Sequence, residues 1–320
     1  MENDPRDIVG VILAGGQGMR MTPLSHRVPK PLLPVCNKRL IVYHLEAMRA
    51  VGIVRVFIVV GHLGELIRDA IGPGHDLGLE ITYVQQESRL GIAHALGLLE
   101  PHIRSPFLLF LADIFFRPSG LERLVSESRA ARRGSHLVVR RDNFEALRKN
   151  FAVLIEAPTR RVTRVIEKPQ SDPGPDRLKG CGLYLLDLPI FAAIRRTPRS
   201  TLRNEYEITD AIQILIDSGE RVETAEVVEE DVNISTPADL LRCNLEELDR
   251  LGVANLIGPE AVIAPTARLR RCIIGAGARI GGKVNLEDCL VFPSVTIGDP
   301  QRPLRNHIVT AEVYIDCNPP

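Results

Sequence analysis

A continuous apolar segment that runs into a glycine-rich loop near the N-terminus most constrains the fold of this chain. Residues 8–13 are apolar throughout, which predicts a buried strand. Glycines follow at once: Gly15, Gly16 and Gly18. Glycine lets backbone N–H groups approach a ligand closely. Arg20 comes next, and Lys30 lies ten residues later between two prolines. A strand, a glycine loop and two cations indicate a site for a polyphosphate.

The spacing of this loop argues against two common nucleotide-binding motifs. It is not GxxxxGK[ST], so the segment is no P-loop, and it is not GxGxxG, which argues against a dinucleotide-binding fold. A glycine turn with an arginine and a lysine placed by chance is the alternative. Motifs elsewhere in the chain are needed to decide between a polyphosphate site and a chance arrangement.

Composition restricts the class of protein. A chain of 320 residues with a 45% hydrophobic fraction is long enough for one large or two ordinary domains. Its zero net charge disfavours a dedicated nucleic-acid binder, and no apolar run reaches membrane-spanning length. The polar start shows no signal peptide, and six scattered cysteines are typical of reduced thiols. We therefore expect a cytoplasmic protein without nucleic-acid or membrane partners. His62 and His94 are expected to form local hydrogen bonds rather than bind metal.

Apolar runs alternate with segments of helical periodicity over the first two thirds of the chain. Strands are predicted at residues 54–60, 79–84 and 107–112, and helices at residues 41–50, 92–99 and 121–133. This order predicts an α/β fold: a Rossmann-like parallel or mixed sheet with helices on both faces. Ligands of such sheets bind beyond the carboxyl ends of the strands. The glycine loop and Asp113 both lie at that position.

From about Asn255 onward the chain has a different pattern. Aliphatic residues recur six apart, and each round is repeated after seventeen residues: Ile257, Ile263 and Leu269, then Ile274, Ile280 and Leu286, then Val291 and Ile297. This spacing predicts a short left-handed parallel β-helix of hexapeptide repeats. An antiparallel meander is disfavoured because alternation with period two is absent. We expect a catalytic domain at 1–250 and a β-helix domain at 251–320, bridged by a helix at 240–251. Because so few coils stack poorly alone, we expect the tail to pack on the first domain or another subunit, as in a homo-oligomer.

Two motifs make the polyphosphate interpretation specific. Residues 15–24 read G-G-x-G-x-R-M-x-P-L, and residues 29–35 read P-K-P-L-L-P-V. The chain thus resembles the sugar-1-phosphate nucleotidyltransferases, and among them the long-form glucose-1-phosphate thymidylyltransferases. Further motifs follow in the family's order from residue 8 to 245. The resemblance implies a Mg²⁺-dependent enzyme that joins an NTP to a sugar-1-phosphate and releases pyrophosphate.

The resemblance also implies catalytic and metal-binding residues. It places Arg20 on the β- and γ-phosphates, Lys30 on the α-phosphate and Asp113 on Mg²⁺. Alignment on Thr236-Pro237 puts Asn233 at the second metal position, with Asp231 as the alternative. The family has an aspartate there, and an amide oxygen binds Mg²⁺ without adding charge. The chain also departs from the family after Asp113, where isoleucine replaces the usual asparagine.

The substrate contacts implied by the resemblance fall into two groups. Gln86, in a segment similar to the family's Q-x-x-x-L-G-x-A-x-A, is placed on the base. The nucleotide group is Leu13, Ala14, Gly15, Gly16, Gly18, Gln86 and Gly91. The sugar-phosphate group comes from an E-K-P, a G-x-Y and an E-I-T-D motif: Glu167, Lys168, Gly182 and Glu207. Ala152 stands where the family usually has glycine and adds a methyl group near the sugar. The resemblance therefore does not determine which sugar is bound.

The resulting prediction is transfer from dTTP or UTP to glucose-1-phosphate or a related sugar or cyclitol phosphate. A guanylyl-, adenylyl- or cytidylyltransferase is the first alternative. A catalytically weak regulatory paralogue is the second, motivated by Asn233 and by the altered neighbour of Asp113. The chain retains four residues that argue against it: Arg20, Lys30, Asp113 and Lys168.

Overall fold

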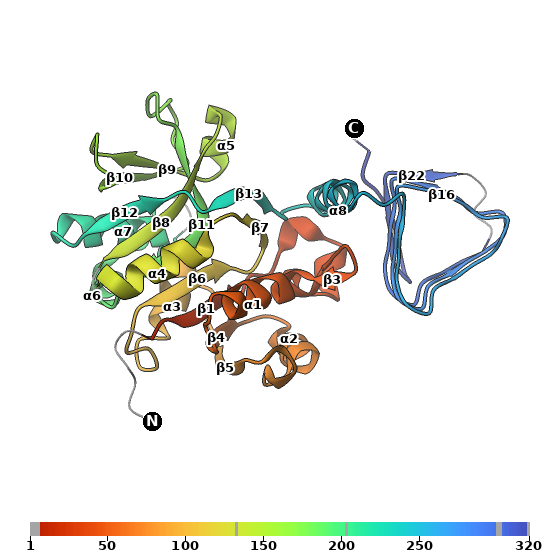
Figure 1. Cartoon of the computed structure of the whole chain (residues 1–320), viewed down its shortest axis with the longest axis horizontal. Coiled ribbons are helices and arrows are strands. Elements are labelled where there is room, and N and C mark those ends of the chain that lie inside the picture. The colour runs from red at the N-terminus through yellow and green to blue at the C-terminus, as the bar shows by residue number, and fades with distance from the viewer. Residues whose placement is uncertain (1–6, 132–133, 202–203, 299–302, 319–320) are drawn as a thin grey trace. The chain divides into compact units, whose positions relative to one another are not determined.

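The computed structural model describes residues 7–131, 134–201, 204–298 and 303–318 (Figure 1). The chain forms two compact units, and neither is continuous in sequence. The first contains the described residues up to 17 together with 43–231. The second contains residues 18–42 and the described residues from 232 onward. The glycine loop is thus divided between the two units after Gln17.

The centre of the first unit is a sheet whose parallel strands begin with the N-terminal apolar run. Strand β1 (Val9–Ala14) pairs in parallel with β4 (Arg55–Val60) and with β6 (Phe107–Leu111), and β5 (Glu80–Gln85) extends the sheet beyond β4. The four predicted strands are confirmed, with ends shifted by about one residue. Their carboxyl ends lie at one edge of the sheet.

The other half of the sheet is largely antiparallel. Strand β11 (Leu178–Leu186) runs antiparallel to β6, to β8 (Ser135–Arg141) and to β9 (Phe151–Ile155). Strand β10 (Val162–Glu167) pairs with β9, and β12 (Val222–Ala225) pairs in parallel with β8. A separate pair joins β7 (Ile114–Pro118) to β13 (Val228–Asn233). The predicted mixed sheet is therefore confirmed.

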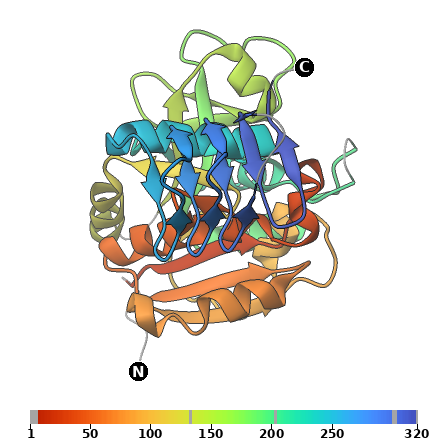
Figure 2. The same cartoon turned by 90° about the vertical axis from the view of Figure 1, so that its right-hand side faces the viewer.

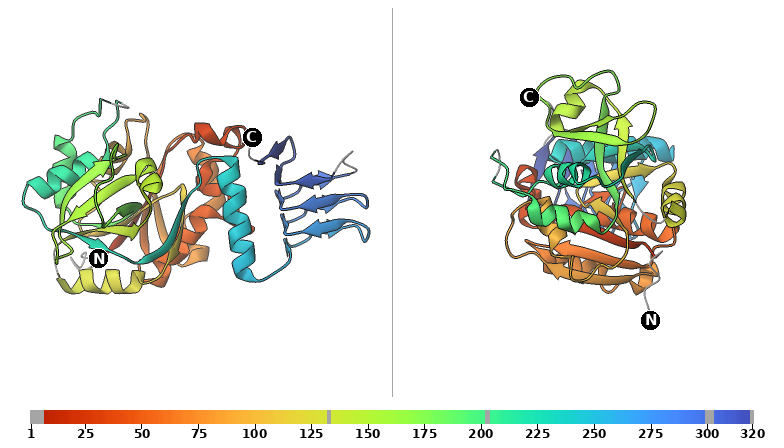
Figure 3. Two further views of the ribbon diagram at one scale, coloured as in Figure 1. Left: turned by 90° about the horizontal axis from the view of Figure 1, so that it is seen from above. Right: turned by 90° about the vertical axis from the view of Figure 1, so that its left-hand side faces the viewer.

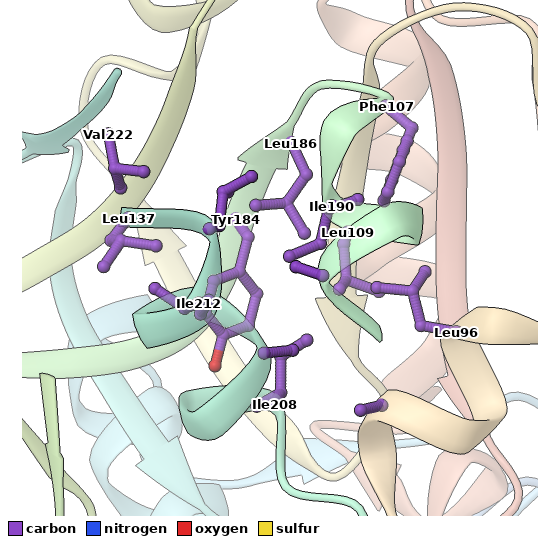
Figure 4. Close-up of a cluster of buried hydrophobic side chains, with 14 of the residues drawn as sticks. Leu96, Phe107, Leu109, Leu137, Tyr184, Leu186, Ile190, Ile208, Ile212 and Val222 are labelled. Carbon is purple, nitrogen blue, oxygen red and sulfur yellow. The ribbon is translucent and has the colours of Figure 1, made fainter. Parts of the chain in front are cut away.

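Helices cover both faces of this sheet, as predicted. On one face, a Cβ atom at Gly10 would lie 2.5 Å from Sδ of Met48 in α1 (Leu40–Ala50). Val9 and Val11 point to the opposite face, since side chains alternate along a strand. There they join a buried cluster with α3 (Ile92–Gly97), α6 (Pro189–Arg196) and α7 (Ile208–Asp217). Figure 4 shows part of this cluster around Tyr184.

Shorter elements complete the first unit. Its remaining α-helices among the described residues are α2 (Gly64–Ile71), α4 (Leu121–Ala131) and α5 (Phe144–Lys149). A 3-10 turn, η4, spans His75–Leu77. Helix α4 begins at the residue predicted, and positions 132–133 of that prediction lie outside the described residues. None of the described helices is both long and apolar enough to span a bilayer.

The second unit combines the early loop with the C-terminal part of the chain. Residues 18–42 contain η1 (Met19–Met21), η2 (Leu24–His26), η3 (Lys30–Leu32) and a hairpin of β2 (Pro34–Val35) and β3 (Lys38–Arg39). Helix α8 (Pro237–Leu251) starts three residues before the prediction. The side chain of Thr236 accepts from Asp239 N and that of Asp239 accepts from Thr236 N, a capping box that fixes this start.

The C-terminal strands stack in three parallel columns (Figures 2 and 3). The columns are β14–β17–β20–β23 (Leu256–Ile257, Ile273–Ile274, Leu290–Val291, His307–Val309), β15–β18–β21 (Val262–Ile263, Arg279–Ile280, Thr296–Ile297) and β16–β19–β22 (Arg268–Arg270, Asn285–Glu287, Leu304–Arg305). Strand β24 (Tyr314–Asp316) adds antiparallel to β23.

The register of these columns reproduces the spacing found in the sequence. Ile257 pairs with Ile274 and Ile274 with Val291, each seventeen residues apart. Ile280 and Leu286 are buried in the middle of their columns. The columns fit a β-helix, while its left hand and its hexapeptide repeats stay predictions.

Candidate active site

The end of β1 meets a buried glutamine. Leu13 O accepts a hydrogen bond from Ala112 N at 3.2 Å, so β1 and the chain entering Asp113 end side by side. A Cβ atom at Gly15 would lie only 2.5 Å from Oε1 of Gln86, and one at Gly61 only 2.7 Å from Gly15 O. Glycine at position 15 is therefore needed for the close approach of the Gln86 carboxamide. Gly16 is exposed, with open space where a Cβ would be.

A second glycine joins the predicted nucleotide and sugar segments. Gly91 has φ +104°, and a Cβ there would meet the backbone of Tyr206 at 2.5 Å from its oxygen. Tyr206 N donates to Leu90 O at 2.7 Å, and Ala93 N donates to Tyr206 O at 3.0 Å. The residue after Tyr206 is Glu207. Backbone hydrogen bonds thus fix the Gln86–Gly91 segment beside the start of α7.

The predicted sugar-phosphate residues cluster around the N-terminus of α7. Glu207 occupies the N-cap position and is only 6% exposed, but its side chain makes no capping hydrogen bond. Instead Ser200 Oγ lies 3.3 Å from its Oε1. Thr209 Oγ1 lies 3.4 Å from Oε2 of Glu167, which ends β10. Two carboxylates therefore converge on one helix start.

Lys168 follows Glu167 in a conformation that is unusual for a residue with a side chain. Its φ is +43°, in the left-handed region. The backbone holds it there, because Lys168 N donates to Asn150 O at 2.8 Å. Strained residues of this kind gather at functional sites. The turn directs the chain away from β10 immediately after the carboxylate of Glu167.

Asp113 lies between β6 and β7 and is half-buried. The next residue, Ile114, accepts a hydrogen bond on its carbonyl from His44 Nε2 at 2.8 Å. His44 is buried against Phe110 and Phe116, and this burial lowers its pKa to about 4. The histidine is therefore neutral near pH 7 and anchors the backbone that carries Asp113.

Gly182 packs directly on this segment. Its φ is +75°, and a Cβ there would lie 2.5 Å from Cδ1 of Ile114. The register of β11 shifts between Gly180 and Tyr184, which marks a bulge at this glycine. Within the first unit, the residues that the sequence assigned to nucleotide, metal and sugar are thus linked by backbone and packing contacts.

Four of the predicted residues belong to the second unit. A Cβ atom at Gly18 would lie 2.9 Å from Cε of Lys30, so the glycine gives room to the buried lysine stem. Arg20 is exposed, and its Nη2 lies 3.5 Å from Ser235 Oγ. Asn233 is half-buried at the end of β13. The two cations and the amide are thus held by one compact unit.

Asp231, the alternative metal ligand, takes part in a buried ion cluster that the sequence did not indicate. Its two carboxylate oxygens lie 2.8 and 2.7 Å from Nζ of Lys179, and Oδ1 lies 3.0 Å from Nε of Arg140. The side chains of Asp231 and Lys179 are 0% and 4% exposed. Arg140 also pairs with Asp142. Lys179 lies in β11 with apolar neighbours, a context that gives no signal for a buried partner.

The residues present are better suited to Mg²⁺ than to a metal whose ligands all come from protein side chains. Among the described residues, no three His, Cys, Asp or Glu side chains are arranged to hold a metal ion. Mg²⁺ is commonly held by one or two protein oxygens together with substrate phosphates and water. In the first unit Asp113 has a carboxylate that could serve in this way, and in the second unit Asn233 has an amide oxygen.

A cavity of about 300 Å³ lies elsewhere in the second unit. It is lined by α8 and by residues of the C-terminal coils, including Arg271 and Asn306. None of the predicted site residues lines it.

Comparison with known proteins agrees with the fold and the motifs. The nucleotidyl transferase family model matches residues 9–246. A glucose-1-phosphate thymidylyltransferase of Streptomyces griseus is 33% identical over 306 residues, or 89% of this chain and 84% of the relative. The low-salt glycan biosynthesis nucleotidyltransferase Agl11 of Haloferax volcanii is 33% identical over 237 residues, or 73% of this chain and 64% of that relative.

Solved structures give the same fold. A Bacillus anthracis protein described as a glucose-1-phosphate thymidylyltransferase, in complex with a sucrose, matches with a TM-score of 0.66 and 26% identity. The match covers 74% of this chain and 94% of that one. The chain therefore belongs to the nucleotidyl transferase family. Within it, the relatives place the chain among the sugar-1-phosphate nucleotidyltransferases, so it is an enzyme of that class.

Proposed function

We propose that this protein transfers a nucleotidyl group from dTTP or UTP to a sugar-1-phosphate, giving a nucleoside-diphosphate sugar and pyrophosphate. The observation that carries the proposal is the position of Tyr206, the residue before Glu207. Its backbone donates to Leu90 O and accepts from Ala93 N, next to Gly91. These hydrogen bonds support the proposal, because they fix the segment proposed to bind the base beside the residue proposed to bind the sugar. The thymidylyltransferase of Streptomyces griseus and the uridylyltransferase AglF of Haloferax volcanii, 33% and 31% identical, favour these two nucleotides.

In the proposed reaction a phosphate oxygen of the sugar-1-phosphate attacks the α-phosphorus of the NTP in line. The bond to the β-phosphate breaks, and pyrophosphate leaves. Both reactants are anions, so the protein must supply positive charge more than a base. Arg20 can bind two oxygens of the β- and γ-phosphates, and Lys30 supplies a point charge to the α-phosphate. Mg²⁺, when bound, would neutralise charge on the phosphates.

The remaining residues position the two substrates. Gln86 presents a carboxamide to the base, with Gly15 and Gly91 leaving room for close approach. Glu167 and Glu207 accept hydrogen bonds from sugar hydroxyls, and Lys168 binds the sugar phosphate. Gly182 leaves space beside the sugar. The glucose of the relatives' names is the first sugar to test.

The metal ligands are proposed as Asp113 and Asn233. Both oxygens of Asp231 already accept hydrogen bonds from Lys179 in a buried cluster, which supports Asn233 over Asp231. A carboxylate paired in this way is not available to a metal without breaking the ion pair.

The proposal is tested by pyrophosphate release that requires the NTP, the sugar-1-phosphate and a divalent cation together. Asp113→Ala should abolish release and also weaken Mn²⁺ binding to the protein–NTP complex, which electron paramagnetic resonance measures directly. Asn233→Asp should retain activity and bind the cation as tightly or more tightly, because it adds a charge.

Asp231→Asn serves as the comparison variant. It keeps the shape of the side chain, and we expect it to lower stability while leaving cation binding in place. Loss of cation binding in Asp231→Asn, with no change in Asn233→Asp or Asn233→Ala, would show that the ligands are assigned wrongly. Full activity after chelation of all divalent cations would contradict the proposed mechanism.

A further inference from the structure

A side chain of α7 bonds the backbone of the strand that ends at Glu167. Strand β10 stands last in its sheet, so the N–H groups on its outer side need partners from elsewhere in the fold. Val165 N donates to Oε1 of Gln213 at 3.0 Å. Val165 is only 8% exposed, which leaves little access for water. Gln213 therefore takes the place of a further strand, two residues before Glu167.

The orientation of the Gln213 carboxamide is determined by both of its partners. A backbone N–H can only donate, so the atom that faces Val165 is the oxygen. At the other end, Nε2 donates to Oδ1 of Asp217 at 2.8 Å, and an ionised carboxylate can only accept. The two bonds require the same orientation of the amide. The acceptor that Gln213 presents to β10 is therefore fixed.

The helix that carries Gln213 is anchored in the core and contacts β10 a second time. Ile212 is completely buried in the cluster of Figure 4. Residues four apart lie on one face of a helix, so Thr209 is one turn from Gln213 on the same face. Thr209 Oγ1 donates to Oε2 of Glu167 at 3.4 Å. Helix α7 thus bonds the backbone of β10 and the carboxylate at its end.

The residue after Glu167 is held by a different contact. Lys168 N donates to O of Asn150, the residue that precedes β9. Loss of the Gln213 bond should therefore displace Glu167 more than Lys168. Hydrogen bonds weaken steeply when distance and angle depart from their optimum. A carboxylate that accepts from a sugar hydroxyl consequently depends on how firmly its strand is held.

We propose that Gln213, together with Thr209, is a positioning residue for the sugar-1-phosphate. It holds the end of β10 so that the Glu167 carboxylate meets a hydroxyl of the sugar. This inference rests on the proposed function, in which Glu167 binds the sugar. It assigns part of sugar recognition to a residue outside the family's motifs. Gln213 acts on the strand backbone and touches neither substrate.

The test compares KM and kcat in pyrophosphate release. Gln213→Leu keeps the approximate size of the side chain and removes the acceptor. We expect KM for the sugar-1-phosphate to rise about tenfold, because displaced binding groups lose their effect steeply, while KM for the NTP changes little. Gln213→Glu combined with Asp217→Asn restores an acceptor toward Val165 and a donor at position 217. In this double variant KM should return toward the wild-type value.

Asp217→Ala is the matched control, because it removes only the other bond of the same side chain. Its KM for the sugar-1-phosphate should stay close to that of the wild type. A lower fraction of folded protein reduces kcat but leaves KM unchanged, so poor folding does not imitate the expected result.

A double-mutant cycle connects the effect to Glu167. Glu167→Ala lacks the carboxylate, so adding Gln213→Leu should raise KM for the sugar-1-phosphate little further. If the effects of the two substitutions multiply instead, Gln213 acts through another residue and the inference is overturned. An unchanged KM in Glu167→Ala would remove this residue from the sugar site and overturn the inference with it.

Thr209→Val and Thr209→Ser give a second test, which applies even if Gln213→Leu does not fold. Valine keeps the branched shape without the hydroxyl, so KM for the sugar-1-phosphate should rise, and serine should restore it. An unchanged KM in Gln213→Leu, or in Thr209→Val where Gln213→Leu does not fold, would overturn the inference while the proposed function stands. A wild type that releases no pyrophosphate with any sugar-1-phosphate would instead count against the proposed function.

Discussion

Single residues in this protein are held by neighbours that the motifs do not include. His44 is the clearest case, because it fixes the carbonyl of Ile114 immediately after Asp113. It is completely buried, and its ring stacks on Phe110. Among the described residues its Nδ1 has no hydrogen-bond partner. A neutral ring suits this apolar site, and a charged ring does not.

The buried His44 predicts a pH dependence of stability. Its pKa is lowered from 6.5 to about 4, so between these values the unfolded chain binds more protons than the folded one. The contribution of His44 to the free energy of unfolding is therefore fully present above pH 6.5 and is lost as the pH falls toward 4. The shift corresponds to about 3 kcal/mol.

Urea unfolding between pH 7 and pH 4 measures this contribution. The free energy of unfolding should fall less steeply with pH in His44→Leu than in the wild type. The variant will be less stable at pH 7, because it loses the bond to Ile114, so the slope is the quantity compared. Exposed His75 provides the control, because His75→Leu should keep the wild-type slope. Parallel curves for wild type and His44→Leu would exclude a buried neutral histidine.

Strands and coils could be predicted from the sequence where a single residue pattern determines their position. The apolar runs gave the parallel strands to within about one residue, because buried strands must be apolar on both faces. The seventeen-residue period likewise matched the strand register, since stacked coils place equivalent residues on one another. Contacts between distant elements could not be predicted. Lys179 is the example, because nothing around it in β11 indicates Asp231 as its partner.

The Gly91 turn is an element whose shape requires glycine for two reasons, its φ of +104° and the backbone of Tyr206. We predict that Gly91→Ala destabilises the protein by about 2 kcal/mol and raises KM for the NTP several-fold. Gly219→Ala is the control, because Gly219 also has positive φ, at +85°, but has nothing within 4 Å of a Cβ. Thermal unfolding and steady-state kinetics measure both effects. If KM for the NTP is unchanged in Gly91→Ala, this turn is not part of the nucleotide-binding site.

At the scale of the whole molecule, the segment that carries Arg20 and Lys30 forms part of the C-terminal unit. Asn244 of α8 is central to this arrangement. Its Oδ1 accepts from Cys36 N at 2.8 Å, and its Nδ2 donates to Pro34 O and Leu240 O, each at 2.9 Å. Asn37 also donates to Ile274 O of the first coil column. The sequence predicted helix and loop separately but gave no sign of this contact.

Asn244→Leu should therefore affect both stability and nucleotide binding. It leaves the Cys36 amide and the Pro34 carbonyl without their partner, which should cost about 3 kcal/mol. The displaced segment carries Lys30, so KM for the NTP should rise while KM for the sugar-1-phosphate changes less. Asn285→Leu, at an exposed position of β19, is the matched control. A stable Asn244→Leu variant with wild-type kinetics would contradict this role for α8.

The most direct measurement is pyrophosphate release with Mg²⁺ across dTTP, UTP, GTP, ATP and CTP, each combined with a panel of sugar-1-phosphates. We expect release with dTTP or UTP and one sugar-1-phosphate, and none when either substrate is omitted. That result would establish the reaction and name both substrates. If folded protein that still binds an NTP releases no pyrophosphate with any combination, the proposed nucleotidyl transfer to a sugar-1-phosphate would be contradicted.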